Sequence, residues 1–282
     1  VRWVSSQAVW RRYDFALAVV REAKRWGAQM IYTWLLPAAL MSLWFNIPTL
    51  LELHDRVTGH LGPQFYRMFY GHKKGKKRLL VITQALKEKL EAQFKTRLPA
   101  AVVQIAPNGV DLDAYENLPS APKARRALEL PEKLTAVYAG HFYTGRGTDL
   151  LLGLAERLPQ VQFLWVGGTE QAVAEWKERL ETLKINNVIL TGFVPNGRLP
   201  LYQAAGDLLL MPYEKFISGS SGGNSVDICS PMKMFDYMAA GRVIISSDLP
   251  VIHEILNPQN AIFCPPGDAD AWAAAINDVL ND

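Results

Sequence analysis

A lysine near a predicted helix start is the first residue whose type and position could do chemistry. The segment 230–241 opens with Ser230 followed by a proline and closes with a glycine, signals that favour the start and the end of a helix. We predict a helix over 231–240, capped by the Ser230 hydroxyl and facing the core with Met232, Phe235 and Ala239. Lys233 lies in its first turn, where free N–H groups and partial positive charge attract anions. The sequence therefore predicts an anion site here, and a surface ion pair of Lys233 with Asp236 is the alternative.

A second cation, Arg146, lies in the glycine-rich segment GHFYTGRG at 140–147. This segment follows a predicted strand, and ligands of open parallel sheets bind at the carboxyl ends of strands. Its glycines do not fit the G-x-G-x-x-G pattern of dinucleotide-binding loops, and no Gly-Lys-Ser/Thr follows as in a P-loop. The pattern argues against a nicotinamide enzyme and an NTPase, although an NAD-dependent Rossmann-like enzyme stays open as an alternative.

The elements that must carry these residues alternate between strand and helix. After residue 130 we expect strands at 135–139, 161–166, 188–191, 208–211, 243–246 and 261–263, and helices at 148–158, 169–184, 198–205, 231–240 and 268–280. Before residue 107 we expect strands at 30–33, 48–53, 79–83 and 102–105 among helices that include 5–26, 37–45 and 85–94. This alternation predicts an α/β protein with two doubly wound parallel sheets, joined by a linker at 118–123.

Four segments together carry a resemblance to a known family. They are LLELHD at 50–55, APNGVDLDAY at 106–115, YAGHFYTGRGTDLLL at 138–152 and SPMKMFDYMAAGRVIISSDLPVIHE at 230–254. The chain resembles glycosyltransferase family 4, the retaining group 1 glycosyl transferases of GT-B architecture. The resemblance implies two Rossmann-like domains, 1–118 on the acceptor side and 119–282 binding the donor. A GT-B chain starts with a strand and a glycine-rich loop and ends with a helix crossing back, so we expect this sequence to be truncated at both ends and its first domain to be incomplete.

The resemblance also implies a donor site for a nucleoside diphosphate sugar. By resemblance, Arg146 takes the place of the cation that neutralises the diphosphate, and with Lys233 it would hold the leaving group from two sides. Negative charge develops on the diphosphate as the glycosidic bond breaks, and fixed cations in a partly dry cleft stabilise that charge. The resemblance implies further donor-binding positions, which are Gly140, His141, Gly168, Val194, Asp227, Ser230 and Asp236. Of these, the backbone near 168 and 194 would contact the base.

Three of these positions depart from the family pattern. His141 stands where the family has an arginine, and Asp236 stands for the glutamate that holds the ribose hydroxyls. The first glutamate of the family's donor motif falls on Ile228, with Asp227 beside it. The contact to the donor sugar is therefore absent, made by the backbone, or supplied by Asp227.

His54 follows the predicted strand 48–53, where the family has a histidine near the donor sugar and the acceptor. A general base and a structural hydrogen bonder are both open interpretations of this side chain. By resemblance, transfer proceeds by front-face attack, with a leaving phosphate oxygen helping to take the acceptor proton, so no carboxylate pair is required. Family enzymes need no bound metal or other cofactor, and the sequence contains no cluster of metal ligands that argues otherwise.

Composition and charge agree with such an enzyme. The chain has 282 residues, enough for two domains, and a formal net charge of +3, which does not favour nucleic acid as a partner. Cys229 and Cys264 form no metal or redox pair, and no signal peptide is visible, so we expect a reducing, cytoplasmic location. The apolar window 35–53 is interrupted by prolines and does not predict a membrane span. The basic cluster HKKGKKR at 72–78 is either an anchor for anionic lipid at the inner membrane face or a solvated helix end.

The function expected from the sequence is transfer of a sugar from a nucleoside diphosphate sugar to a saccharide or lipid-linked acceptor, as in polysaccharide biosynthesis. The resemblance implies that the transfer proceeds with retention. One alternative is a non-catalytic nucleotide-sugar-binding relic of the same fold, which Ile228 and His141 favour. A phosphorylase or epimerase on this fold is another alternative. The base, the sugar and the acceptor carry no readable code in the sequence.

Overall fold

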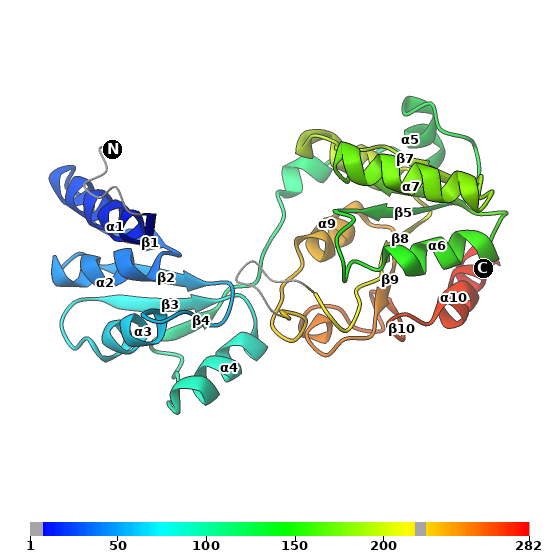
Figure 1. Cartoon of the computed structure of the whole chain (residues 1–282). Helices are drawn as coiled ribbons and strands as arrows, with labels where there is room; N and C mark the ends of the chain where they lie inside the picture. Colours follow the sequence, from blue (N-terminus) through cyan, green and yellow to red (C-terminus); the bar gives the residue numbers. More distant parts are fainter. Residues whose placement is uncertain (1–7, 218–223, 282) are drawn as a thin grey trace. The chain divides into compact units, whose positions relative to one another are not determined.

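The computed structural model describes residues 8–217 and 224–281, and the chain divides into two compact units, Val1–Pro107 and Asn108–Asp282 (Figure 1). Each unit is built on a sheet of parallel strands with helices between them. The predicted α/β class with two parallel sheets is therefore confirmed. The two units are described separately below.

The first unit holds a four-stranded sheet in the order β1-β2-β3-β4, so strand order follows chain order. Its strands are β1 (Ile31–Thr33), β2 (Thr49–Leu53), β3 (Lys77–Val81) and β4 (Val103–Ile105), and its helices are α1 (Ala8–Arg25), α2 (Leu36–Trp44), α3 (Gly62–Gly71) and α4 (Gln84–Phe94). The side chains of β2 alternate between buried and half-buried, and α2 buries most of its residues. The apolar window 35–53 is thus a core helix followed by a strand, as predicted.

The second unit holds a six-stranded sheet in the order β10-β9-β8-β5-β6-β7. Its strands are β5 (Thr135–Ala139), β6 (Gln162–Val166), β7 (Val188–Leu190), β8 (Leu208–Met211), β9 (Val243–Ser247) and β10 (Ile262–Cys264). Its α-helices are α5 (Ala121–Ala127), α6 (Thr148–Arg157), α7 (Glu170–Thr182), α8 (Leu199–Ala204), α9 (Met232–Ala240) and α10 (Ala269–Asn281), and its 3-10 helices are η1 (Leu112–Tyr115), η2 (Asn196–Arg198) and η3 (Ile252–Glu254). The predicted strands and helices of this part are all present, with ends shifted by a few residues.

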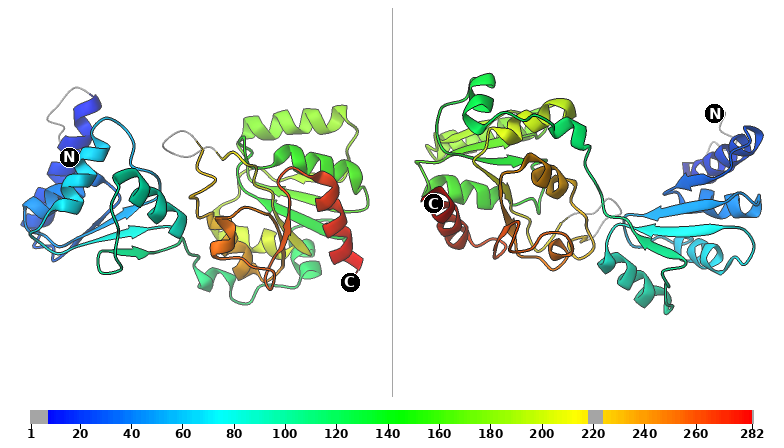
Figure 2. Two further views of the ribbon diagram at one scale, coloured as in Figure 1. Left: turned by 90° about the horizontal axis from the view of Figure 1, so that it is seen from below. Right: turned by 180° about the vertical axis from the view of Figure 1, so that it is seen from behind.

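Helices cover both faces of the second sheet, which Figure 2 shows from below and from behind. Every residue of β5, β6 and β8 is buried, as expected for inner strands of a parallel sheet. On one face, α6 and α10 join the strands in a core that contains Trp165 and Trp272, both fully buried. On the other face, α9 places Tyr237 beneath the strand ends, where its hydroxyl accepts a hydrogen bond from the Ala139 N–H at 2.9 Å and donates one to the Leu210 carbonyl at 3.2 Å.

The strand order of this sheet reverses between β5 and β8. The chain runs outward from β5 through β6 to β7, then returns to the other side of β5 and runs from β8 to β10. The loops that leave β5 and β8 therefore depart to opposite sides, which opens a crevice at the carboxyl ends of these two strands. Open parallel sheets favour a ligand site at such a point.

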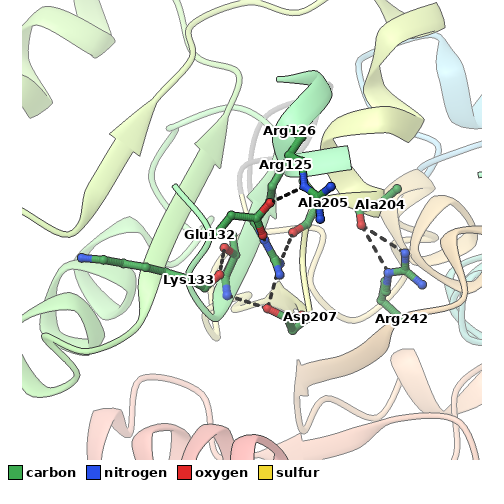
Figure 3. A network of polar contacts seen from close by, with 9 residues as sticks. Arg125, Arg126, Glu132, Lys133, Ala204, Ala205, Asp207 and Arg242 are labelled. Atoms are coloured by element: carbon green, nitrogen blue, oxygen red, sulfur yellow. Dashed lines mark hydrogen bonds and ion pairs between the residues drawn. The ribbon is translucent and has the colours of Figure 1, made fainter. Parts of the chain in front are cut away.

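The segment before β5 belongs to the second unit through a network of charged side chains (Figure 3). Arg125, on α5, donates to the Ala205 carbonyl at 2.9 Å and to the Asp207 carboxylate at 3.0 Å. Asp207 also accepts the Thr135 N–H at 2.7 Å. Helix α5 begins inside the predicted linker 118–123, so that prediction is wrong. The structural boundary lies after Pro107, ahead of the boundary expected at 118–119, because Asn108 and Tyr115 already bond to Ser230 and Gln203 of the second unit.

Candidate functional site

The glycine-rich loop after β5 lies directly on the chain that follows β8. A Cβ added to Gly147 would lie 1.8 Å from the Pro212 carbonyl oxygen, and one added to Gly145 would lie 2.0 Å from the Phe216 carbonyl oxygen. Both glycines also have positive φ, at 77° and 87°, which L side chains rarely adopt. Close backbone approach is therefore the physical reason for these glycines, and it holds Arg146, between them, against the segment after β8.

Arg146 points at Tyr213, the second residue after β8. The guanidinium Nη1 donates a hydrogen bond to the Tyr213 hydroxyl at 3.0 Å, and its Cζ lies 5.2 Å from the centre of the Tyr213 ring. Tyr213 is buried, and burial raises the pKa of its hydroxyl to about 12. Arg146 is thus held by a neutral group at the switch point of the sheet.

Lys233, on the first turn of α9, lies near the same tyrosine. Its Nζ lies 5.2 Å from the centre of the Tyr213 ring and 4.0 Å from the centre of the Tyr138 ring. Burial and the nearby charge of Arg146 hold the pKa of Lys233 well below its usual value. The structure therefore brings together the two cations that the sequence suggested, and their repulsion makes this place favourable for an anion.

The start of α9 differs from the prediction. Pro231 is the N-cap residue and no side chain caps the helix, whereas the buried Ser230 hydroxyl accepts the Asn108 N–H at 3.2 Å. Ser230 is therefore not the helix cap, because the chain entering the second unit takes its hydroxyl. The predicted core stripe is wrong as well, since α9 buries Met234, Tyr237 and Ala240 and leaves Met232 63% exposed.

Asp236 lies on α9 one turn after Lys233. Burial raises the pKa of its carboxyl, while a hydrogen bond from the Tyr115 hydroxyl and the charge of Lys233 act in the opposite direction. The Tyr115 hydroxyl, at the end of η1, also lies 2.9 Å from the Gln203 side-chain oxygen, so its single proton serves either this oxygen or the Asp236 carboxylate. The carboxylate predicted to hold the ribose thus lies beside Tyr115 and Lys233.

The other predicted positions of this unit differ in how near they lie to the cations. Gly140 is close, because an added Cβ would lie 2.9 Å from Lys233 Nζ. Asp227 is near Cys229, and the pKa of the Cys229 thiol is raised by the charge of Asp227 and lowered by the charge of Arg146. His141 is exposed, and its ring stacks on Tyr143 with ring centres 4.8 Å apart.

Gly168 and Val194 occupy the neighbouring loops after β6 and β7. A Cβ added to Gly168 would lie 2.5 Å from the Phe142 ring, and Val194 is partly buried in the segment before η2. Phe142 belongs to the glycine-rich loop, so Gly168 borders the loop that carries Arg146. For Val194, the structure gives no direct contact with the cations.

His54, in the first unit, directly follows β2. Its Nε2 lies 2.7 Å from a Glu52 carboxylate oxygen, and its side chain is 53% exposed. Its place at the carboxyl end of a parallel strand agrees with the sequence prediction.

Sequence reasoning missed the tyrosines that surround the cations. Tyr138 is the penultimate residue of β5 and Tyr213 follows β8, so their positions relative to Lys233 depend on strand order. Tyr115 lies on η1, beside Asp236. A weak signal was present, since Tyr138 and Tyr213 both stand where buried strands give way to loops. Aromatic residues are common at such places in structural cores, so the signal could not be separated from packing.

No group of three or more His, Cys, Asp or Glu side chains that could hold a metal ion is found in the described part of the chain. Within that part, no helix has both the length and the apolar character that crossing a bilayer requires. A cavity of about 590 Å³ lies in the first unit between α1, β1 and the start of α2. Its lining includes Arg11 and Arg12 but no carboxylate or histidine, and none of the predicted site residues, so we place the candidate site at the second sheet.

Comparison with known proteins finds a similar sequence among curated proteins. The sequence is 28% identical over 198 residues to the alpha-galactosylglucosyldiacylglycerol synthase of Streptococcus pneumoniae, a match that covers 68% of this chain and 49% of that protein. The chain thus spans about half of the length of this curated relative.

Solved structures share the fold. The structure of Anabaena Alr3699/HepE in complex with UDP has a TM-score of 0.71 at 22% identity, covering 95% of this chain and 72% of that one. A glycosyltransferase from Rickettsia africae has a TM-score of 0.74 at 15% identity, covering 98% of this chain and 73% of that one. Together with the two parallel sheets, these likenesses identify the fold as GT-B.

The sequence pattern of one family, glycosyl transferases group 1, matches residues 133–282. That range takes in β5 and its glycine-rich loop, the segment after β8 and the whole of α9, which are the elements that carry Arg146, Tyr213 and Lys233. Because the match includes more than half of the chain, this protein belongs to the family of group 1 glycosyl transferases.

Proposed function

We propose that this protein is a retaining glycosyltransferase that takes a nucleoside diphosphate sugar as donor and a saccharide or lipid-linked molecule as acceptor. The observation that carries the proposal is the approach of Arg146 and Lys233 to one tyrosine at the switch point of the second sheet. Family membership and the UDP complex of the similar Anabaena protein support it. In this proposal the second unit binds the donor and the first unit binds the acceptor.

The two cations have a direct chemical task in such a transfer. The bond between sugar C1 and the β-phosphate oxygen breaks, and negative charge grows on the departing diphosphate. Arg146 and Lys233 stabilise that charge, and the uncapped N–H groups of α9 add to the same field. The acceptor hydroxyl oxygen forms the new bond to C1 from the same face, and its proton passes to a phosphate oxygen of the leaving group. No metal is assigned to this scheme.

The remaining predicted residues take supporting roles in the proposal. Asp236 accepts the ribose hydroxyls, and Asp227, near Cys229, contacts the donor sugar in place of the family's first glutamate. Gly140 lets the diphosphate approach the backbone beside Lys233. His54 contacts the acceptor from the first unit.

Titration calorimetry with UDP, GDP and ADP tests the donor site. Wild-type protein is expected to bind at least one of the three, and Arg146→Met and Lys233→Met are each expected to weaken binding by about tenfold or more. Lys177→Met is a matched control, because Lys177 is exposed on α7 and makes no contact with the site. Binding that is unchanged in both site variants would contradict the proposal. Addition of EDTA is expected to leave the affinity unchanged.

One observation favours a second candidate, a relic that binds the donor without transferring the sugar. Ile228 is fully buried at the position of the family's first glutamate, so it offers no polar group to the donor sugar. Release of UDP from UDP-glucose separates the two functions. Nucleotide binding with no donor hydrolysis and no transfer, at any acceptor tested, favours the relic.

The basic cluster in the first unit supports peripheral contact with an anionic membrane in the cytoplasm. Lys73, Lys74 and Lys76 are exposed. Lys77 is not available for lipid, because its amine donates to three backbone carbonyls at the end of α3. Sedimentation with phosphatidylglycerol vesicles tests this part, and binding equal to that on neutral phosphatidylcholine vesicles would contradict it.

A further inference from the structure

Tyr213 touches both cations of the candidate site, although each cation comes from a different element. Its hydroxyl accepts from Arg146 at 3.0 Å, and its ring centre lies 5.2 Å from Lys233 Nζ. Arg146 belongs to the loop after β5, whereas Lys233 belongs to α9. The relative position of the two charges therefore depends on a side chain from a third element, the segment after β8.

The surroundings of Tyr213 hold it firmly. The side chain is only 3% exposed. The Tyr213 N–H donates to the Met211 carbonyl at 3.0 Å, and its own carbonyl accepts the Ser247 hydroxyl at 2.6 Å, which ties it to the end of β9. The preceding residue lies against Gly147, at the other end of the loop that carries Arg146. A group held in this way can fix its neighbours before a ligand arrives.

A tyrosine is suited to this task because it holds a guanidinium without cancelling its charge. A carboxylate at the same place would form an ion pair and compete with an anionic ligand. Across residues 8–217 and 224–281, neither Arg146 nor Lys233 is found in an ion pair with a carboxylate. Burial raises the pKa of the Tyr213 hydroxyl to about 12, so the group stays neutral near pH 7. The positive charge of the Arg146 guanidinium is thereby kept for the ligand.

We infer that Tyr213 is a positioning residue that holds Arg146 and Lys233 together as one preformed binding pair for a diphosphate. The inference rests on the proposed function, since it names how the proposed donor site is organised. Tyr213 acts through the cations and is not assigned a contact with the sugar. Because its hydroxyl acts through Arg146, the effect of removing the hydroxyl depends on whether Arg146 is present.

A double-mutant cycle on UDP affinity tests the inference. Tyr213→Phe keeps the ring and removes the hydroxyl, and it is expected to weaken UDP binding by about tenfold, the usual effect of one hydrogen bond to a charged group. In an Arg146→Met background the same substitution is expected to have no further effect. Tyr237→Phe is the matched control, because it also removes a buried, bonded hydroxyl but touches neither cation, and its UDP affinity is expected to equal that of wild type.

Two results would overturn the inference while leaving the proposed function intact. One is a Tyr213→Phe variant that binds UDP as wild type does. The other is an equal loss with and without Arg146, which a purely structural role would give. Failure of the wild-type protein to bind UDP, GDP or ADP would instead refute the proposed function, and the inference with it.

A second variant covers the case in which Tyr213→Phe does not fold. Ser247→Ala removes the hydrogen bond to the Tyr213 carbonyl without touching a cation. It is expected to weaken UDP binding by roughly threefold, again only when Arg146 is present. An equal loss in the Arg146→Met background would contradict the inference.

Discussion

Replacing Lys233 by methionine is expected to stabilise the ligand-free protein and to remove part of its pH dependence. The pKa of Lys233 lies well below its ordinary value of 10.5, because the amine is buried beside Arg146. In the unfolded chain the amine regains its ordinary pKa, so between the two pKa values the unfolded state binds one more proton than the folded state. The free energy of unfolding of the wild type therefore rises with pH in this window, by about 1.4 kcal/mol per pH unit. Methionine has a similar length and helix propensity and no charge, so the variant lacks this slope.

Urea unfolding between pH 7 and 9.5, without nucleotide, measures the effect. The advantage of Lys233→Met over the wild type is expected to be largest at the low end of the window and to shrink by about 1.4 kcal/mol per pH unit as the pH rises toward 10.5. The upper limit avoids the buried tyrosines Tyr138, Tyr213 and Tyr237, whose raised pKa values make the protein lose stability above pH 10. Lys177→Met, on an exposed face, is expected to differ from the wild type by a constant amount. A constant difference for Lys233→Met as well would refute the assignment of a depressed pKa to this amine.

Three further substitutions test the framework of the site. Gly147→Ala is expected to destabilise the protein by about 3 kcal/mol or more, because its Cβ would lie 1.8 Å from a carbonyl oxygen. The control Gly241→Ala is expected to cost about 1 kcal/mol, because that glycine has a positive φ but open space around it. Urea unfolding compares the two variants. Asp207→Asn leaves Arg125 buried beside a neutral amide, and we expect the free energy of unfolding to fall by about 3 kcal/mol in calorimetric unfolding. A decrease below about 1 kcal/mol would show that the network of Figure 3 is not needed for stability. Ser230→Ala removes the acceptor of a backbone N–H and is expected to lower the free energy of unfolding by about 1 kcal/mol in the same assay. If the variant instead keeps its stability and loses nucleotide affinity, Ser230 contacts the ligand.

The sequence by itself determined the architecture of the second unit. Buried strands such as 135–139 and 208–211 are short apolar runs between periodic helical segments, and this local pattern survives folding with small shifts of the ends. It also indicated Arg146 and Lys233, because charge next to a glycine-rich loop or a helix start is visible without a fold. The linker prediction failed because α5 is held by Arg125 and Asp207, and their bond joins residues that the sequence keeps far apart.

Only the tertiary structure decided what surrounds the two cations. The order of β5 and β8 brings Tyr138 and Tyr213 to one place. The Ser230 hydroxyl accepts the N–H of Asn108, a residue far away in the sequence, in place of capping its helix. The core face of α9 likewise depended on which sheet face the helix meets, so its stripe could not be found by spacing alone. Local patterns are set by neighbours along the chain. The environment that shifts a pKa or holds a guanidinium is set by groups that are neighbours only in space.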